Sequence, residues 1–260
     1  MIVRTPEERE ALIEAGRRLG AILEEVGSKV APGVTTDLLE TLANSLIRAG
    51  GDKPAFEGYT PEGARRPYPA SLCVSINEEV VHGIPNESPR TLKEGDIVAL
   101  DLGLIHDGIV VDSAITVAVG KVSKEARELM QATQNALEAA IAAAVPGARI
   151  GDISYATGAA FKGTDFSVVK MLGGHGVGKH VHEEPYIAND GHPGTGPEVV
   201  AGMVLALEPI ANAGKAGVQL ASDGYTYRTK DGSISAHFEH TILVQEGGAL
   251  VVTQRPSEVR

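Results

Sequence analysis

Apolar residues recur every three or four positions in four stretches of the chain, which is the spacing of a helix with one buried face. The first stretch follows Thr5, where a capping residue, a proline and two glutamates stand in order. Paired glycines after the second stretch indicate its end. We therefore predict helices from Thr5 to Ala31, from about Thr36 to Gly50, from Ser123 to Pro146, and onward from about Asp152.

Two further stretches are apolar without a helical period, and they indicate strands. Ile97–Asp101 and Val110–Ser113 each contain a carboxylate that the apolar run itself does not stabilise. The segment from Gly103 to Gly108 between them, which contains Asp107-Gly108, predicts a turn. Asp101 and Asp112 would then face each other across a hairpin.

The pattern around these two acids occurs again downstream. An alignment without gaps places Glu208 on Asp101 and Glu239 on Asp112. We interpret this as a duplicated half-domain of roughly 110 residues. A pseudo-twofold axis would bring all four acids to one centre. The aligned segments are 92–101 with 199–208, and 112–117 with 239–244.

Four carboxylates at one point repel each other unless they keep protons or gather cations. A pair of divalent metal ions best explains acids that lie inside apolar runs rather than beside turns. The alternative is that they are separate, solvated acids at strand ends, where Asp and Glu side chains usually lie.

Composition narrows the class of protein. The 260 residues suit a single domain, 1–260, of two pseudo-symmetric halves, about 1–120 and 121–250. The net charge of −11, without a basic run, argues against nucleic-acid or anionic-membrane binding. One cysteine, Cys73, excludes an internal disulfide and fits a reducing compartment. With no signal region and no membrane-spanning run, we expect a cytoplasmic monomer.

Histidines stand between the helices and the acidic strands of both halves. In the first half, Tyr68–Pro85 alternates β-branched residues, which predicts a strand pair with its turn near Asn77. His82 follows this pair and precedes Gly-x-Pro. A single histidine in such a loop is most often structural or solvated, so the pattern alone leaves its role open.

In the second half, His175 lies in the glycine-rich run 173–178, whose glycines permit a close approach of backbone. The run lacks the spacing of the dinucleotide and Walker phosphate loops. His180 and His182 would share one face of a strand, although an H-x-H pair is a weak metal signal.

These acids and histidines fall in six short motifs: Ser75-Ile76-Asn77-Glu78, Val81-His82-Gly83-Ile84-Pro85, Gly174-His175-Gly176-Val177-Gly178, His182-Glu183-Glu184-Pro185, Leu207-Glu208-Pro209 and Phe238-Glu239-His240-Thr241. The set resembles the methionine aminopeptidases of type I, the bacterial-like class, over essentially the whole chain. The resemblance implies an α+β pita-bread fold, in which a curved antiparallel sheet is flanked by helices and encloses a metal site. It also implies a metallo-exopeptidase that hydrolyses the N-terminal methionine from peptides and nascent chains, with a preference for a small second residue.

The resemblance further implies two divalent metal ions, with Co, Mn, Fe and Zn as candidates. Asp101 would bind one ion, His175 and Glu208 the other, and Asp112 and Glu239 would bridge them. One imidazole against four carboxylates is a hard ligand set, which favours Mn, Fe or Co over a thiolate-type zinc site.

Three residues receive catalytic roles from the resemblance. Glu208 would act as general base and pass the proton of the attacking water to the leaving amine. His82 would lie beside the nitrogen of the scissile bond and His182 beside its carbonyl oxygen. The ribosome is a further possible partner, which the resemblance leaves open.

The resemblance places the methionine side chain in a pocket. The segment Thr60–Arg66 is longer than the corresponding bacterial loop, and His180 stands where glycine is common. Val181 replaces a bulkier phenylalanine and Tyr225 a tryptophan, so the pocket departs from the family more than the metal ligands do. The expected substrate-binding residues are His82, His182, Tyr68, Cys73, Val181 and Tyr225.

Two rival functions stay open from sequence. One is a proline-specific aminopeptidase or prolidase of the same fold, although those relatives usually carry a large additional N-terminal domain. The other is a metal-free pita-bread protein that serves as a binding module. Such modules lose metal ligands, whereas all five expected ligands are present here.

Overall fold

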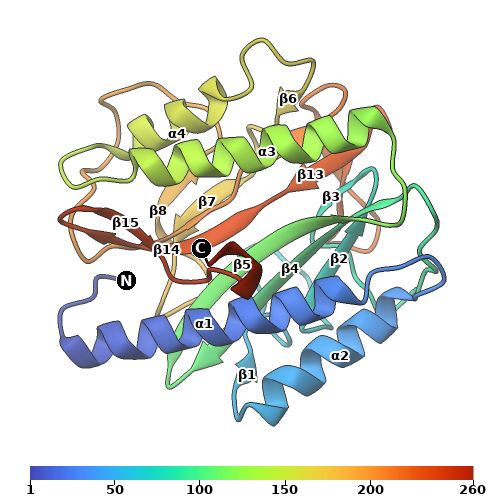
Figure 1. The fold of residues 1–260 in the computed structure, drawn as a ribbon, viewed down its shortest axis with the longest axis horizontal. Helices are drawn as coiled ribbons and strands as arrows, with labels where there is room; N and C mark the ends of the chain where they lie inside the picture. The colour runs from blue at the N-terminus through green and yellow to red at the C-terminus, as the bar shows by residue number, and fades with distance from the viewer. Residues whose placement is uncertain (260) are drawn as a thin grey trace.

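Four helices cover one face of a curved sheet in this computed structural model, which describes residues 1–259 (Figure 1). The Thr5 hydroxyl accepts a hydrogen bond from the Glu8 N–H at 3.2 Å, and Ser123 caps its helix in the same way through Ala126 at 3.0 Å. Both caps confirm the predicted starts. The helices are α1 (Pro6–Ser28), α2 (Thr36–Ala49), α3 (Lys124–Ala143) and α4 (Ile150–Ala159), and a short 3₁₀ turn, η1 (Pro256–Glu258), precedes the C-terminus.

Within residues 1–259 the main sheet has nine strands, all paired antiparallel, in the order β1-β4-β5-β14-β9-β7-β8, with β15 on β14 and β2 on β4. The strands are β1 (Lys53–Pro54), β2 (Leu72–Ile76), β4 (Ile97–His106), β5 (Ile109–Ala118), β7 (Gly173–Gly176), β8 (Glu183–Ala188), β9 (Val204–Leu207), β14 (Glu239–Gln245) and β15 (Gly248–Val251).

The turn predicted between the two strands is confirmed at Asp107-Gly108, but its predicted start at Gly103 is wrong, because β4 continues to His106. Both residues of the turn have positive φ, at 46° and 77°. Gly103 is needed inside the strand, where a Cβ atom would lie 2.6 Å from the ring of Phe56. Position 103 therefore needs glycine because of close packing against Phe56, not because of a turn.

Two three-stranded sheets complete the fold, and one of them corrects a predicted pair. The strands predicted around Asn77 exist as β2 and β3, but β2 pairs with β4 and β3 with β12. The two strands do not pair with each other, because the backbone N–H of Ile76 in β2 donates to the side chain of Glu79 at 3.0 Å instead of to a carbonyl of β3. The sheets are β13-β10-β6 and β11-β12-β3, formed by β3 (Glu79–Val81), β6 (Ser167–Val168), β10 (Ile210–Asn212), β11 (Val218–Leu220), β12 (Tyr227–Thr229) and β13 (Ser235–His237).

The core fills the space between helices and sheet. Ile242 and Val244 of β14 share one apolar cluster with Leu137 of α3. Because side chains alternate along a strand, Glu239 points to the opposite face. Leu100 and Leu102 belong to the cluster beneath α1, so Asp101 points the same way as Glu239. The helices thus fix which sheet face carries the acids.

Each half of the chain begins with two helices and continues into strands, as the repeat predicts (Figure 1). The proposed boundary near residue 120 falls between β5 and α3, and the division into these two halves stays a prediction. No helix within 1–259 is both long and apolar enough to cross a membrane.

Candidate metal centre

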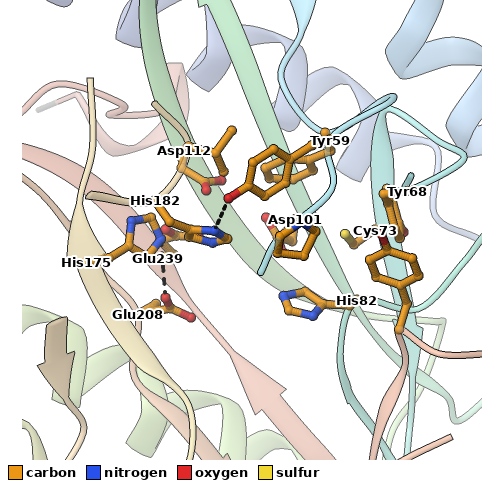
Figure 2. Close-up of a pocket in the computed structure, with 14 residues that line it drawn as sticks. Tyr59, Tyr68, Cys73, His82, Asp101, Asp112, His175, His182, Glu208 and Glu239 are labelled. Atoms are coloured by element: carbon orange, nitrogen blue, oxygen red, sulfur yellow. Dashed lines mark hydrogen bonds and ion pairs between the residues drawn. The ribbon is translucent and has the colours of Figure 1, made fainter. Parts of the chain in front are cut away.

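Five neighbouring strands, in the order β4-β5-β14-β9-β7, bring the five predicted ligands together (Figure 2). In the β4–β5 register Asp101 lies opposite Ala114 and Asp112 opposite Gly103, so the two acids are diagonal neighbours on one face rather than directly opposed. His175 on β7, Glu208 just after β9 and Glu239 at the start of β14 reach the same point from the other half of the sheet.

Their donor atoms are spaced as metal ligands would be. Asp112, His175 and Glu239 each offer one atom, and these atoms all lie within 4.8 Å of one another. Nε2 of His175 lies 3.6 Å from Oε1 of Glu208. Nδ1 of His175 lies 2.9 Å from the carbonyl oxygen of Gly176, so it carries the proton and leaves the lone pair of Nε2 facing the acids.

The acids are buried without the partners that buried charges need. Oδ1 of Asp101, Oδ1 of Asp112 and Oε1 of Glu239 have no hydrogen-bond partner among residues 1–259. Burial raises the pKa of Asp101 to about 7. Burial and then the charges of neighbouring acids raise the pKa of Asp112 and Glu239 well above the usual range, and burial and Asp101 do the same for Glu208. Oxygen donors that lack partners, together with one imidazole, fit divalent cations.

Glycines allow His175 to reach this point. A Cβ atom at Gly174 would lie 2.3 Å from the carbonyl oxygen of Ala206, and one at Gly176 would lie 2.3 Å from that of Glu184. Strand β7 is therefore pressed between β8 and β9 on either side of the histidine. The sequence prediction of a close backbone approach is confirmed here.

His82 sits on a strained turn directly after β3, with a φ of 59°. The N–H of Gly83 donates to the Ser75 hydroxyl at 3.1 Å, and the Gly83 carbonyl accepts from the N–H of Val74 at 2.9 Å. A Cβ atom at residue 83 would lie 2.2 Å from the Val74 carbonyl oxygen. Contacts to β2 therefore hold His82 in its unusual conformation.

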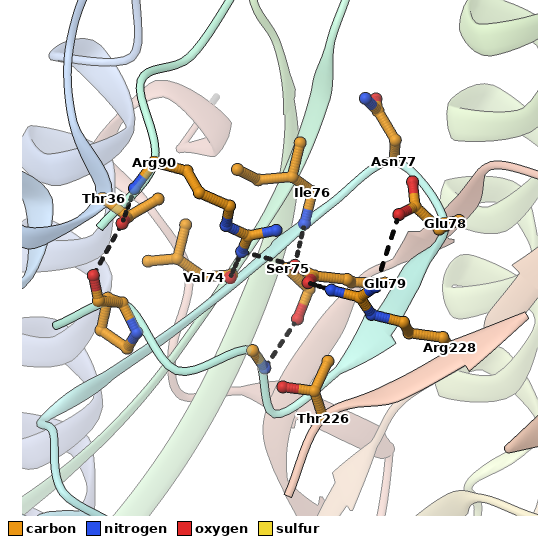
Figure 3. Close-up of polar contacts among 12 residues, drawn as sticks. Thr36, Val74, Ser75, Ile76, Asn77, Glu78, Glu79, Arg90, Thr226 and Arg228 are labelled. Atoms are coloured by element: carbon orange, nitrogen blue, oxygen red, sulfur yellow. Dashed lines mark hydrogen bonds and ion pairs between the residues drawn. The ribbon is translucent and has the colours of Figure 1, made fainter. Parts of the chain in front are cut away.

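Glu79 fastens β3, the strand that leads into this turn, to its neighbours, and the sequence analysis did not single it out (Figure 3). Its side chain is 3% exposed and binds Arg90 at 2.6 Å and Arg228 at 2.7 Å. It thereby joins β3 to β12 and to the segment before β4. In the sequence, Glu79 beside Glu78 looks like any solvated acid, so no local signal could have found it.

His182 lies in a loop that precedes β8, so the predicted strand with His180 and His182 on one face is wrong. Oε1 of Glu183 accepts hydrogen bonds from the N–H groups of Lys179 and His180 at 2.6 and 2.8 Å, and Oε2 binds the N-terminal ammonium group of Met1. These bonds curl the loop, and His180 is exposed. The ring of His182 lies edge-on to that of His175, with centroids 4.5 Å apart.

An apolar pocket adjoins the acids, and all six expected substrate-binding residues line it (Figure 2). Tyr68 and Tyr225 meet edge to face with centroids 5.1 Å apart, and the Tyr68 hydroxyl donates to the Gly83 carbonyl at 2.9 Å. The sequence analysis missed three further lining residues, which lie just before or within the long loop: Phe56, Tyr59 and Pro61.

His237 was also missed. Its Nε2 lies 3.6 Å from Oε2 of Glu208 and 3.9 Å from Oε2 of Glu239. The signal was available, because His237 precedes Glu239 by two positions and residues two apart on an extended chain share a face.

Comparison with known proteins agrees with this site. The model of metallopeptidase family M24 matches residues 10–246. A methionine aminopeptidase of Aquifex aeolicus is 43% identical, over 95% of this chain and 96% of the relative, and that of Escherichia coli is 36% identical, over 98% and 95%.

Solved structures give the same result. The crystal structure of methionine aminopeptidase from Thermotoga maritima matches with a TM-score of 0.92 and 41% identity, over 98% of this chain and 100% of that one. A prolidase from Pyrococcus furiosus matches with a TM-score of 0.72 at 22% identity, over 97% and 65%, which shows a shared fold alone. The pita-bread fold, the curved antiparallel sheet with outer helices, is thereby confirmed. The chain belongs to metallopeptidase family M24 and, within it, to the methionine aminopeptidases, which are hydrolases.

Proposed function

We propose that this protein removes the N-terminal methionine from nascent proteins and peptides, with Glu208 as general base. The observation that carries the proposal is the juxtaposition of buried acids without partners and an apolar, aromatic pocket. A substrate whose first side chain fills that pocket would present its first peptide bond to the acids.

Two divalent metal ions, of Co, Mn, Fe or Zn, are the proposed cofactors. Asp101 would hold one, His175 and Glu208 the other, and Asp112 and Glu239 would bridge them. Burial lowers the pKa of His175 to about 3, so its imidazole is neutral and can bind a cation. When bound, such ions polarise the scissile carbonyl and lower the pKa of a water molecule to near neutrality.

Glu208 can take and return a proton because its two oxygen atoms lie in different surroundings. Oε1 faces His175, and burial raises the pKa of the carboxyl group above its usual range. A carboxylate with a raised pKa accepts a proton from the attacking water more readily, and it can then pass that proton to the leaving amine.

His82 and His182 would contact the peptide bond from two sides. Burial lowers the pKa of His82 to about 4, so at neutral pH it is an uncharged imidazole that can donate one hydrogen bond. We assign it to the nitrogen of the scissile bond and His182 to the carbonyl oxygen, where charge develops in the transition state.

The pocket would take the methionine side chain. Methionine is unbranched and polarizable, and its sulfur makes favourable contacts with aromatic edges. Tyr68, Tyr225 and Cys73 provide such a wall, and we place Val181 at the mouth, where the second residue of the substrate enters. Small second residues would fit best.

We further propose that the chain works as a single-domain monomer in the cytoplasm on emerging nascent chains, and hence near the ribosome. The free, buried Cys73 fits a reducing compartment. Nothing in this proposal needs contact with nucleic acid or membrane, and the net charge of −11 disfavours both.

The test is release of methionine from Met-Ala-Ser by protein stripped with a chelator and reloaded with one metal at a time. We expect turnover only after reloading, and little on an Ala-Pro peptide. Preferential turnover of Ala-Pro would support the prolidase-like alternative. Protein that binds no metal in a content assay would instead support the binding module.

A further inference from the structure

His237 is a buried imidazole held in a fixed place. It ends β13, opposite Ile210 in the register, and its side chain is 2% exposed. Its backbone is fastened twice to β5, since its N–H donates to the Thr116 hydroxyl at 2.9 Å and that hydroxyl donates to its carbonyl at 2.8 Å. The position of the ring therefore follows from the sheet rather than from a mobile loop.

Both ring nitrogens of His237 lack a hydrogen-bond partner among residues 1–259. A buried polar group in this state is costly. Two carboxylate oxygens lie near its Nε2, Oε2 of Glu208 at 3.6 Å and Oε2 of Glu239 at 3.9 Å. Neither distance is a hydrogen bond, yet contacts of this kind often tighten when the reacting complex forms.

The two oxygen atoms of Glu208 face different imidazoles at the same distance. Oε1 lies 3.6 Å from Nε2 of His175 and Oε2 lies 3.6 Å from Nε2 of His237. His175 cannot donate to Glu208, because its proton is on Nδ1, beside the Gly176 carbonyl. Of these two rings, only His237 can present an N–H to the carboxylate.

His237 also lies behind the acids rather than among them. Glu208, Glu239 and His175 line the pocket next to the metal centre, whereas His237 does not reach the pocket surface. This placement fits a residue that supports a carboxylate better than one that binds the cation itself.

We propose that His237 is a positioning residue for Glu208: its Nε2–H holds Oε2 in the orientation that proton transfer needs and leaves Oε1 on the side of His175. The inference rests on the proposed function, in which Glu208 is the base. Residues that orient a ligand or base in this way typically contribute about 10–100-fold in activity or metal affinity.

The experiment compares His237→Leu, which removes the donor at similar volume, with His237→Gln, whose amide can still donate. Exposed His192 supplies the control, His192→Leu. We expect His237→Leu to bind Mn²⁺ with parent stoichiometry and a dissociation constant within about threefold in calorimetry, while kcat on Met-Ala-Ser falls about 10–100-fold and KM changes little. His237→Gln should recover most of kcat.

A second readout does not depend on turnover. In protein loaded with diamagnetic Zn²⁺, whose charge keeps Glu208 ionised, ¹H–¹⁵N NMR should show the His237 ring with its proton on Nε2, and Glu208→Gln should shift that resonance. A ring protonated on Nδ1, or a resonance that ignores Glu208→Gln, would overturn the proposal even if the parent released no methionine and the proposed function itself failed.

If the parent protein is active, three outcomes of the kinetic and metal-binding measurements contradict the inference. Parent kcat in His237→Leu would mean that the ring does not act on Glu208. Loss of one metal site would make His237 a ligand instead. Equal losses in the Leu and Gln variants, with recovery in neither, would mean that the ring only fills space.

Discussion

The hydroxyl oxygen of Tyr59 lies 2.9 Å from Nδ1 of His182, although 123 positions separate the two residues in the chain. Their rings are tilted by 58° with centroids 5.4 Å apart. The loop that carries His182 has no strand partner at this point, so Tyr59 is the side chain that fixes the direction of its ring (Figure 2).

Tyr59→Phe should therefore lower activity without removing the aromatic wall of the pocket. One hydrogen bond of this kind contributes about 0.5–1.5 kcal/mol, which predicts a fall in kcat of about twofold to tenfold. Steady-state kinetics on Met-Ala-Ser measures it. A change in KM alone would show that Tyr59 only contacts the methionine side chain.

The bridging assignment predicts what happens when one acid is lost. Asp112→Asn and Glu239→Ala should each lose one of two tight metal sites, and kcat should fall roughly a hundredfold or more. Lys121→Ala, on the exposed loop after β5, serves as control. Calorimetry that still found two tight sites in Glu239→Ala would remove it from the ligand set.

His82→Ala and His182→Ala should keep both metals and lose rate. A lost contact to developing charge typically costs about 2.7–4 kcal/mol, or about 100- to 1,000-fold in kcat. Metal content and rate need to be measured on the same sample. If metal leaves with either imidazole, that histidine binds the ion directly.

Metal removal should make stability depend on pH. Folded, metal-free protein keeps protons on acids such as Asp101, whose pKa is raised to about 7, while the unfolded chain releases them near the ordinary value of 3.8. Their contribution to the free energy of unfolding then falls as pH rises through that window. Buried neutral histidines such as His175 and His82 act in the opposite direction between about pH 5.5 and pH 7.5, because their pKa values are lowered. The contribution of the acids is therefore measured as a difference between the parent and a variant that lacks Asp101.

Asp101→Asn is the matched variant for this measurement. It removes one titrating group, so the Tm of the metal-free parent should fall more, or rise less, between about pH 5.5 and pH 7.5 than that of the metal-free variant, by about 5 °C. Saturating metal at the higher pH should raise the Tm of the parent. A variant whose Tm changed with pH as that of the parent does would show that Asp101 does not keep its proton in the folded, metal-free protein.

Val181→Phe should sharpen selectivity at the second substrate position. Val181 is 6% exposed and lines the apolar pocket. A larger ring there would narrow the mouth, so kcat/KM should fall more for Met-Leu than for Met-Ala peptides, by about tenfold, the effect of one or two methylenes in an apolar pocket. Better cleavage of Met-Leu by the variant would place Val181 elsewhere.

Local chemistry made much of this fold predictable from sequence. Thr5 and Ser123 cap helices through bonds to residues three positions away, so the signal and its effect lie in one short segment. The four acids could be found because the same sequence pattern occurs in both halves of the chain. Because side chains alternate along a strand and the apolar ones face the helices, the acids lie on the opposite face of the sheet.

Contacts between distant segments were beyond such reasoning. Gly103 looked like a turn because its partner, Phe56, lies 47 positions away, and Glu79 looked solvated because Arg228 lies 149 positions away. The direction of a loop set by a single carboxylate, as at Glu183, leaves no periodic trace either. His237 is the exception, since strand alternation pointed to it.

The two glycines beside His175 carry a consequence for how the sequence can vary. Each is closed off by a neighbouring strand's carbonyl oxygen, not by a side chain that could rotate away. In a saturation library selected for function, residues 174 and 176 should therefore accept as few replacements as the histidine itself. Neutral substitutions should therefore accumulate in loops rather than at these two positions, because the backbone of the neighbouring strands leaves no room for a side chain there.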